Sequence, residues 1–343
     1  MNTTKKLMTL LLALLALTVC DSNDESDYSK DPRIYMAVSD LDHGYVFDDK
    51  GNTIYECPIN SVIKILANEG NTWYAVRATG LDEENVQYDL LRNGEEMFPF
   101  TDQVRSMCVV NGDVYTLQFR EKGDAPYPRC LIYKNEELLY EHYVYGRYFH
   151  SFDVVDGHLV AGVHDSFSGK AIYWIDGEFY TYPSEDNICL DSYAREGENE
   201  LLVLKYKDYS QDNLSPNKYS FNGKLYELPN DFVTHQSMIV NGIPYITGWH
   251  DNTYQAYLIV NGVEHPLEND PVGIRMKRYG DSVYILASSS DDENPTKSQI
   301  FKLDEQPVDL SAIVNLKHLD DGDKNLVPLS ETFVEDFIVL PPK

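Results

Sequence analysis

The amino-acid sequence predicts an all-β fold, a β-propeller built from four-stranded blades. A tight turn recurs 39 to 46 residues apart along the chain, and a short apolar run that often contains Tyr keeps the same interval. No segment shows a sustained helical periodicity. Four strands in about 40 to 45 residues is the size of a propeller blade. The turns are Lys50-Gly51, Asn93-Gly94, Asn135-Glu136, Asp176-Gly177, Asn222-Gly223, Asn261-Gly262 and Asp304-Glu305.

Each repeated unit is expected to contain strands A, B, C and D in that order. In one copy, VRSMCVV (104–110) is strand A, Asn111-Gly112 is the turn, and VYTLQF (114–119) is strand B. Strands C and D form the closing hairpin around the recurring turn, where Asn-Gly and Asp-Gly tolerate the positive φ of a tight hairpin. The 26 tyrosines suit β-structure and binding surfaces.

The two ends of the chain predict how the ring closes. Six complete units run from about Ile59 to Ala312, while residues 33–58 supply strands B, C and D without an A. The tail Ser330 to Lys343 contains one further strand, which completes a seventh blade and removes an open sheet edge. Residues 33–343 are therefore one propeller domain of seven blades. Six or eight blades are the alternatives, because Ile313 to Leu329 has no clear place in the repeat.

The N-terminus is typical of an exported, lipid-anchored protein. Residues 1–19 contain two lysines and then an apolar core too short to span a bilayer. The LTVC sequence ending at Cys20 resembles a bacterial lipobox, which implies lipidation of Cys20; an ordinary signal peptide is the alternative. Residues 20–32 are acidic and polar, and we expect a flexible tether.

The hairpin YWIDG (173–177) gives the chain a family resemblance. It resembles Bacteroidota propeller lipoproteins whose blades carry a YWxNG hairpin, and other copies here read LLRNG and LIVNG. The resemblance and the acidic tether imply an outer-membrane lipoprotein displayed on the cell surface, with a periplasm-facing location as the alternative. The motif is structural, so it implies fold and location but no chemistry.

The charge limits the partners. The chain has 28 basic and 56 acidic residues; removing residues 1–19 takes away two lysines and leaves a formal net charge of −30. This charge disfavours nucleic acid and anionic membrane surfaces, so lipid on Cys20 would be the only membrane attachment. No metal-binding or cofactor pattern occurs. Four further cysteines lie in strand-like runs and are expected to be buried thiols: Cys57, Cys108, Cys130 and Cys189.

One face of the propeller is the candidate binding face. The C–D turns are short and uniform, whereas the B–C loops on the opposite face vary in length, and function concentrates on variable loops. Counting back seven residues from the A–B turn glycine places Arg105, His150 and His235 at one position at the channel mouth, with Lys64 and Arg275 within two residues of it. Such a cluster would bind an acidic ligand, for example a uronate-bearing glycan. Pairing with nearby acids is the alternative.

An aromatic segment lies next to this cluster. Tyr145, Arg147 and Tyr148 belong to YEHYVYGRYFHSF (140–152), in which aromatic faces alternate with polar groups. Such a pattern suits stacking on a sugar. Strand alternation and core packing explain many of the same residues.

Two His-Asp steps lie near the ends of B strands. Trp249 is a candidate ligand platform beside His250 and Asp251, and His164 with Asp165 occupies the matching place two blades earlier. Imidazole and carboxylate groups bind metals, but these steps supply no set of three ligands.

These observations favour a non-catalytic surface lipoprotein that binds a glycan or another acidic ligand. The alternatives are a protein-interaction platform in an envelope assembly and a polysaccharide lyase or hydrolase. No nucleophile elbow, P-loop, dinucleotide fingerprint or HExxH motif is present, and 56 acidic residues allow no catalytic carboxylate pair to be assigned.

Overall fold

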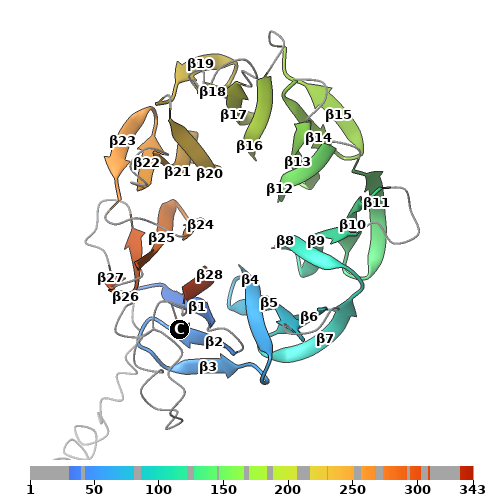
Figure 1. The fold of residues 1–343 in the computed structure, drawn as a ribbon, viewed down its shortest axis with the longest axis vertical. Helices are drawn as coiled ribbons and strands as arrows, with labels where there is room; N and C mark the ends of the chain where they lie inside the picture. The colour runs from blue at the N-terminus through green and yellow to red at the C-terminus, as the bar shows by residue number, and fades with distance from the viewer. Residues whose placement is uncertain are drawn as a thin grey trace, which may run out of the picture. The chain divides into compact units, whose positions relative to one another are not determined.

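The computed structural model places four-stranded β-sheets around a central axis (Figure 1). Residues Ile34–Leu340 form one compact unit. The described residues are 31–39, 43–80, 86–121, 127–144, 147–165, 170–183, 188–206, 217–229, 231–250, 256–267, 273–291, 294–302, 308–309 and 333–342.

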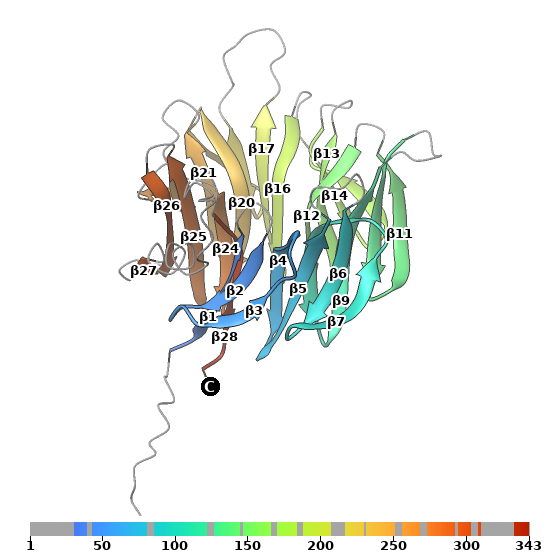
Figure 2. The same ribbon diagram turned by 60° about the horizontal axis from the view of Figure 1, so that its bottom comes forward.

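Within these ranges the strands form seven sheets of four, and no helix occurs. The predicted all-β propeller is therefore confirmed. In six sheets the first strand in chain order, and in the closing sheet β28 (Phe333–Leu340), faces the centre of the ring (Figure 1). Figure 2 shows these inner strands from the side, running along the central axis. The inner strands are β4 (Ser61–Glu69), β8 (Gln103–Val110), β12 (Arg147–Val155), β16 (Ile188–Glu196), β20 (Phe232–Val240), β24 (Gly273–Tyr279) and β28 (Phe333–Leu340).

The second strand of each sheet forms the core. In β5 every residue from Trp73 to Ala78 is buried, because the strand is covered on both faces by the neighbouring blades. Burial on both faces explains why these segments are continuous apolar runs rather than alternating ones. The second strands are β1 (Arg33–Ser39), β5 (Thr72–Thr79), β9 (Asp113–Arg120), β13 (His158–Asp165), β17 (Asn199–Tyr206), β21 (Ile243–His250) and β25 (Ser282–Asp291).

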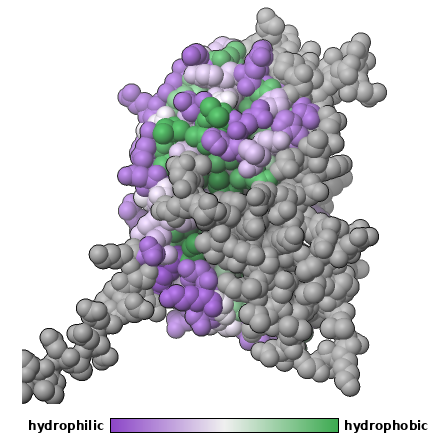
Figure 3. Space-filling view, turned by 90° about the vertical axis from the view of Figure 1, so that its left-hand side faces the viewer, coloured by the Kyte–Doolittle hydropathy of each residue, from purple (hydrophilic) through white to green (hydrophobic). Residues whose placement is uncertain are grey.

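The third and fourth strands form the outer hairpins. Fourth strands such as β15 are exposed along their whole length, and Figure 3 shows apolar areas among polar side chains on one side of the ring. The third strands are β2 (Gly44–Asp48), β6 (Gln87–Arg92), β10 (Arg129–Lys134), β14 (Ile172–Ile175), β18 (Lys218–Phe221), β22 (Ala256–Val260) and β26 (Asn294–Lys302). The fourth are β3 (Thr53–Glu56), β7 (Glu95–Phe100), β11 (Glu137–Tyr143), β15 (Glu178–Thr181), β19 (Lys224–Glu227), β23 (Val263–Pro266) and β27 (Val308–Asp309).

The recurring Asn or Asp of the outer turn ties its hairpin to the second strand. Asn93 has a φ of 50°, and its backbone N–H donates to the Trp73 carbonyl at 2.9 Å. Its side-chain Oδ1 accepts from the Trp73 N–H at 3.0 Å. We call this pair of bonds the hairpin clamp. It recurs in the pairs Asn135 with Val114, Asp176 with Leu159, and Asn222 with Glu200.

The ring closes between the two ends of the chain, as the sequence predicts. Strand β28 is hydrogen-bonded to β1 at the edge of the β1–β2–β3 sheet. Val334, Phe337 and Val339 pack into one apolar cluster with Met36 and Phe47. The composite blade therefore leaves no open edge between the first and last blades.

The four cysteines of the sheets are free thiols. Cys57, Cys130 and Cys189 are buried, and Cys108 is half-buried. Burial raises the pKa of the Cys57 thiol to about 12. These thiols are packed as small apolar groups, as the sequence predicts.

Candidate functional site

A central cavity of about 780 Å³ runs between the inner strands. Its lining comes from all seven of them, from β4 round to Asp336 on β28. We call the end where the inner strands begin the loop end, and the end where they run into two-residue turns the turn end. Pockets of 300 to 1,000 Å³ are the size that small-molecule ligands occupy.

Five inner strands carry a one-residue β-bulge at the same height in the cavity wall. In β20 the register with β21 shifts between Thr234 and Gln236, so His235 has no partner across the strand. A bulge bends its strand and re-aims the extra side chain. We call the five extra residues the bulge ring: Lys64, Arg105, His150, Asp191 and His235.

The bulge in β20 needs a small neighbour. Gly248 lies opposite Thr234, and a Cβ built on Gly248 would meet the Val233 carbonyl oxygen at 2.1 Å and the Phe232 ring at 2.6 Å. Gly248 therefore lets the two backbones approach closely where the strand bends.

The bulge ring corrects the register taken from the sequence. The turn glycine is the first loop residue after β4 and β16, at Gly70 and Gly197, but the second after β8, at Gly112. Counting from the glycine therefore displaced Lys64 by one residue and missed Asp191. Counted from the first loop residue, all five members lie six positions before the turn.

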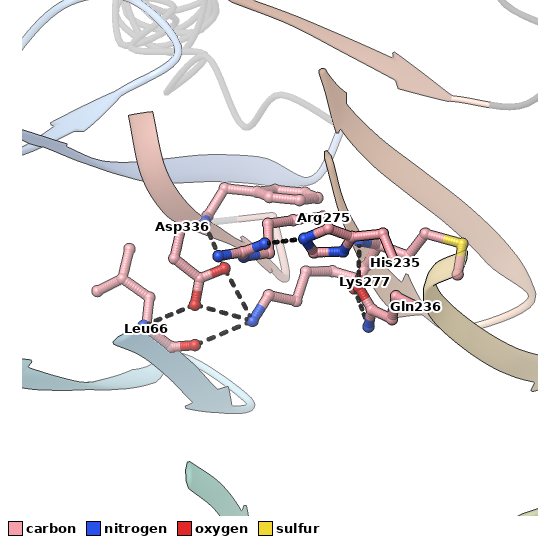
Figure 4. A network of polar contacts seen from close by, with 8 residues as sticks. Leu66, His235, Gln236, Arg275, Lys277 and Asp336 are labelled. Atoms are coloured by element: carbon pink, nitrogen blue, oxygen red, sulfur yellow. Dashed lines mark hydrogen bonds and ion pairs between the residues drawn. The ribbon is translucent and has the colours of Figure 1, made fainter. Parts of the chain in front are cut away.

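Arg275 is outside the bulge ring, because β24 pairs with β25 without a register shift and Arg275 lies opposite Leu286. Its guanidinium nevertheless reaches the ring, since Arg275 Nη1 donates to His235 Nε2 at 2.8 Å (Figure 4). Desolvation by the surrounding cavity wall, reinforced by the Arg275 charge, lowers the pKa of the His235 imidazole to about 4. His235 is therefore neutral at pH 7. The Trp249 ring lies 6.4 Å from the His235 ring.

Other charges of the cavity wall form ion pairs with the closing strand. Lys64 Nζ lies 2.6 Å from Glu335 Oε1. Lys277 Nζ lies 3.1 Å from Asp336 and 3.1 Å from the Leu66 carbonyl, and Asp336 also accepts from the Leu66 N–H (Figure 4). Lys64 therefore follows the alternative expected from the sequence: it pairs with a nearby acid, Glu335 on β28.

The turn end of the cavity is also internally paired. Glu196 accepts from the N–H groups of Asn241 and Gly242 on the next blade and pairs with Arg278. Burial raises the pKa of Glu196, but these backbone bonds and Arg278 outweigh it, and the net pKa is lowered.

Five charged side chains of the cavity lining have no ion pair among the described residues. Asp156 and Arg195 lie at or next to the two-residue turns, and Arg105, Asp153 and Asp191 lie further along the wall. Arg105 is exposed to the cavity, with its guanidinium carbon 5.3 Å from the centroid of Phe119. Asp153 is exposed to the cavity, and desolvation by the surrounding wall raises its pKa, against the Val154 N–H and Lys277. Burial also raises the pKa of Asp191.

Unlike most of the bulge ring, Arg147 of the aromatic segment does not line the cavity. Its Nε pairs with Asp165 at 2.7 Å, and its guanidinium stacks over Phe179. Asp165 is 1% exposed, so this pair belongs to the blade packing. His164 lies opposite Tyr148 in the register of β12 and β13. The side chains of Tyr148 and His150 lie outside the described residues, as do Tyr145 and Cys20.

His250 is held by its own blade rather than aimed into the cavity. Its Nδ1 lies 2.6 Å from Asp231, and its ring packs edge-on against Tyr257 at 4.6 Å. Asp251 lies outside the described residues, together with most of the variable B–C loops and the turn Asp304-Glu305. No group of three possible metal ligands occurs in the described part of the chain. No helix there is long and apolar enough to cross a membrane.

Comparisons with known proteins support the fold. No protein-family model matches the chain, and no curated protein matches it. A prolyl endopeptidase structure matches with a TM-score of 0.53 at 9% identity, covering 90% of this chain and 55% of that one. The β-propeller domain of the trilobed protease from Pyrococcus furiosus matches with a TM-score of 0.52 at 13% identity, covering 82% of this chain and 96% of that domain.

An acylaminoacyl peptidase from Pyrococcus horikoshii matches with a TM-score of 0.46 at 12% identity, covering 73% of this chain and 52% of that one. The chain thus spans about half the length of the two whole peptidases. At these identities the prolyl endopeptidase and the trilobed protease support a shared propeller fold and no shared chemistry.

Proposed function

We propose that this chain is a non-catalytic ligand-binding lipoprotein of the cell surface whose central cavity binds a carboxylate-bearing glycan. The lipid on Cys20 and the tether of residues 20–32 would hold the propeller at the outer membrane. The sequence features of the N-terminus support this location, and the composition of the cavity wall supports the ligand class.

The observation that carries the proposal is the state of Arg105. This guanidinium is exposed inside a cavity of about 780 Å³, on a protein of strong negative charge, with no acidic partner among the described residues. Phe119 supports it from one side. An arginine held in this way can bind a carboxylate through two parallel hydrogen bonds.

Arg275 and Trp249 extend the same site. The neutral His235 accepts a hydrogen bond from Arg275 and so orients its guanidinium. The Trp249 ring is not part of the cavity lining but lies 6.4 Å from the ring of His235, which is. Aromatic faces stack on the apolar faces of sugar rings, so a uronate-bearing glycan fits the combination.

The test is isothermal titration calorimetry with two tetrasaccharides that differ in their carboxylates. One is heparosan, which alternates glucuronate and N-acetylglucosamine; the other is neutral N-acetylchitotetraose. We expect heparosan to bind at least about tenfold more tightly, which corresponds to about 1.4 kcal/mol. Arg105→Gln should remove most of this preference, because the glutamine side chain is uncharged.

The matched control is Arg92→Gln, because Arg92 stacks over Tyr74 as Arg105 stacks over Phe119 but lies on an outer hairpin. This variant should bind like the unmodified protein. Equal affinity for both tetrasaccharides, or heparosan binding that survives Arg105→Gln, would overturn the proposal. A stoichiometric protein partner that blocks the cavity in envelope extracts would favour an interaction platform instead.

A further inference from the structure

The cavity wall carries unpaired charges of both signs. Arg105, Asp153 and Asp191 come from β8, β12 and β16, three successive inner strands. Lys64, Lys277 and the other paired groups are neutralised within the wall by acids of β28 and β16. Apart from Asp156 and Arg195, which lie at or next to the two-residue turns, the wall is therefore cationic at Arg105 and anionic at Asp153 and Asp191 on the two strands that follow.

The two aspartates are disposed to receive a cation. Among the described residues, Asp153 accepts the N–H of its own neighbour Val154 at 2.8 Å and no other hydrogen bond, and Lys277 acts on it as a more distant charge. Asp191 lies within hydrogen-bonding reach of Thr234 and interacts with the more distant charge of Lys205, yet burial still raises its pKa. A carboxylate in such surroundings gains most from a ligand group that donates hydrogen bonds and carries positive charge.

A ligand of one sign does not complement this wall. A polyanion drawn to Arg105 would bring its next carboxylates towards Asp153 and Asp191, and like charges at short range repel. A polycation would meet Arg105 and Arg275. Neighbouring blades place their inner strands on the order of 10 Å apart, so a ligand that spans them is longer than one sugar ring.

We infer that the cavity binds a zwitterionic glycan, in which a carboxylate pairs with Arg105 while a protonated amino group on a neighbouring sugar pairs with Asp153 and Asp191. This inference rests on the proposed function and names the chemistry of its ligand. An unacetylated amino sugar next to a uronic acid supplies both groups at neutral pH.

The probes are the heparosan tetrasaccharide and its N-deacetylated form, which keep the same carboxylates and differ in the amine. Calorimetry at low salt should show at least about tenfold tighter binding of the N-deacetylated form. The double variant Asp153→Asn, Asp191→Asn should lose this preference and still bind N-acetylated heparosan. Glu136→Gln, which removes an exposed acid on an outer turn, should keep the preference. Thermal unfolding confirms that each variant is folded.

The outcomes separate the two claims. Equal binding of the two forms overturns the inference of a zwitterionic ligand but leaves the proposed carboxylate site at Arg105 intact. A preference that persists in the double aspartate variant also overturns it, because the amine is then recognised elsewhere. Binding of neither form refutes the anion site, and the zwitterionic ligand with it.

Discussion

The outer hairpins and the bulge ring both recur in several blades. The hairpins repeat a residue type with its backbone geometry, whereas the bulges repeat only the backbone geometry. The hairpins keep the residue as well as the geometry: Asn93, Asn135 and Asn222 each have a φ near 50° and bond the second strand. The bulges keep the backbone shift and change the residue. Lysine, arginine, histidine and aspartate occupy one position in successive blades.

The difference separates stability from recognition. A residue that is repeated with its hydrogen bonds pairs with backbone N–H and C=O groups in each blade. Replacing it therefore lowers the free energy of unfolding. A backbone feature whose residue varies between blades builds an asymmetric wall. The inner strands combine both roles, because charges paired across the closing strand stabilise the ring and unpaired charges face the ligand.

The largest expected effect is on a paired inner charge. Asp336→Ala leaves Lys277 without its acid and the Leu66 N–H without its acceptor. We expect the free energy of unfolding to fall by about 3 kcal/mol, measured by urea denaturation. Glu335→Gln is the control: its partner Lys64 is 39% exposed, so the loss should stay below about 1 kcal/mol. Losses of equal size would show that β28 is not held by the buried Asp336.

The next effect distinguishes the two bonds of the hairpin clamp. Asn93→Ala loses the bond from the Trp73 N–H and puts alanine at positive φ, and should cost about 2 kcal/mol. Asn261 also has positive φ, but Pro244 occupies the partner position and has no N–H to donate. Asn261→Ala should therefore cost about 1 kcal/mol less, by urea denaturation. Equal costs would assign the motif to turn conformation alone.

The smallest effect concerns the pH response of His235. Its pKa of about 4 lies below the unfolded value of 6.5, so the unfolded chain takes up the proton first as the pH falls. This histidine therefore contributes a loss of stability between pH 6.5 and about 4, and nothing above that window. Its Hε1 resonance in an NMR titration should move with a midpoint near 4. Arg275→Gln should raise the midpoint, although burial keeps it below 6.5; a midpoint at or above 6.5 in the unmodified protein would contradict a neutral His235.

The sequence predicted the repeat because the hairpin clamp needs particular residues. Asn-Gly or Asp-Gly occupies four of the seven turns, and the second strand, buried on both faces, is a continuous apolar run in the sequence. The closing strand was predictable as well, since residues 33–58 lack a first strand and the tail supplies one.

The site was predictable only in part. The bulge has no sequence signature of its own, and Gly197 occupies a different turn position from Gly112, so Asp191 was missed. Lys64 pairs with Glu335 across 271 positions of sequence, which no local pattern indicates. Arg147 and His250 carry promising residue types, but tertiary packing joins them to Asp165 and Asp231.

The most direct measurement is a crystal structure of the protein with the N-deacetylated heparosan tetrasaccharide. We predict the glycan in the central cavity, with a carboxylate hydrogen-bonded to Arg105 and an amino group within reach of Asp153 or Asp191. A glycan bound on the outer surface, for example among the aromatic rings around Trp174, with the cavity holding only solvent, would contradict the assignment of recognition to the bulge ring.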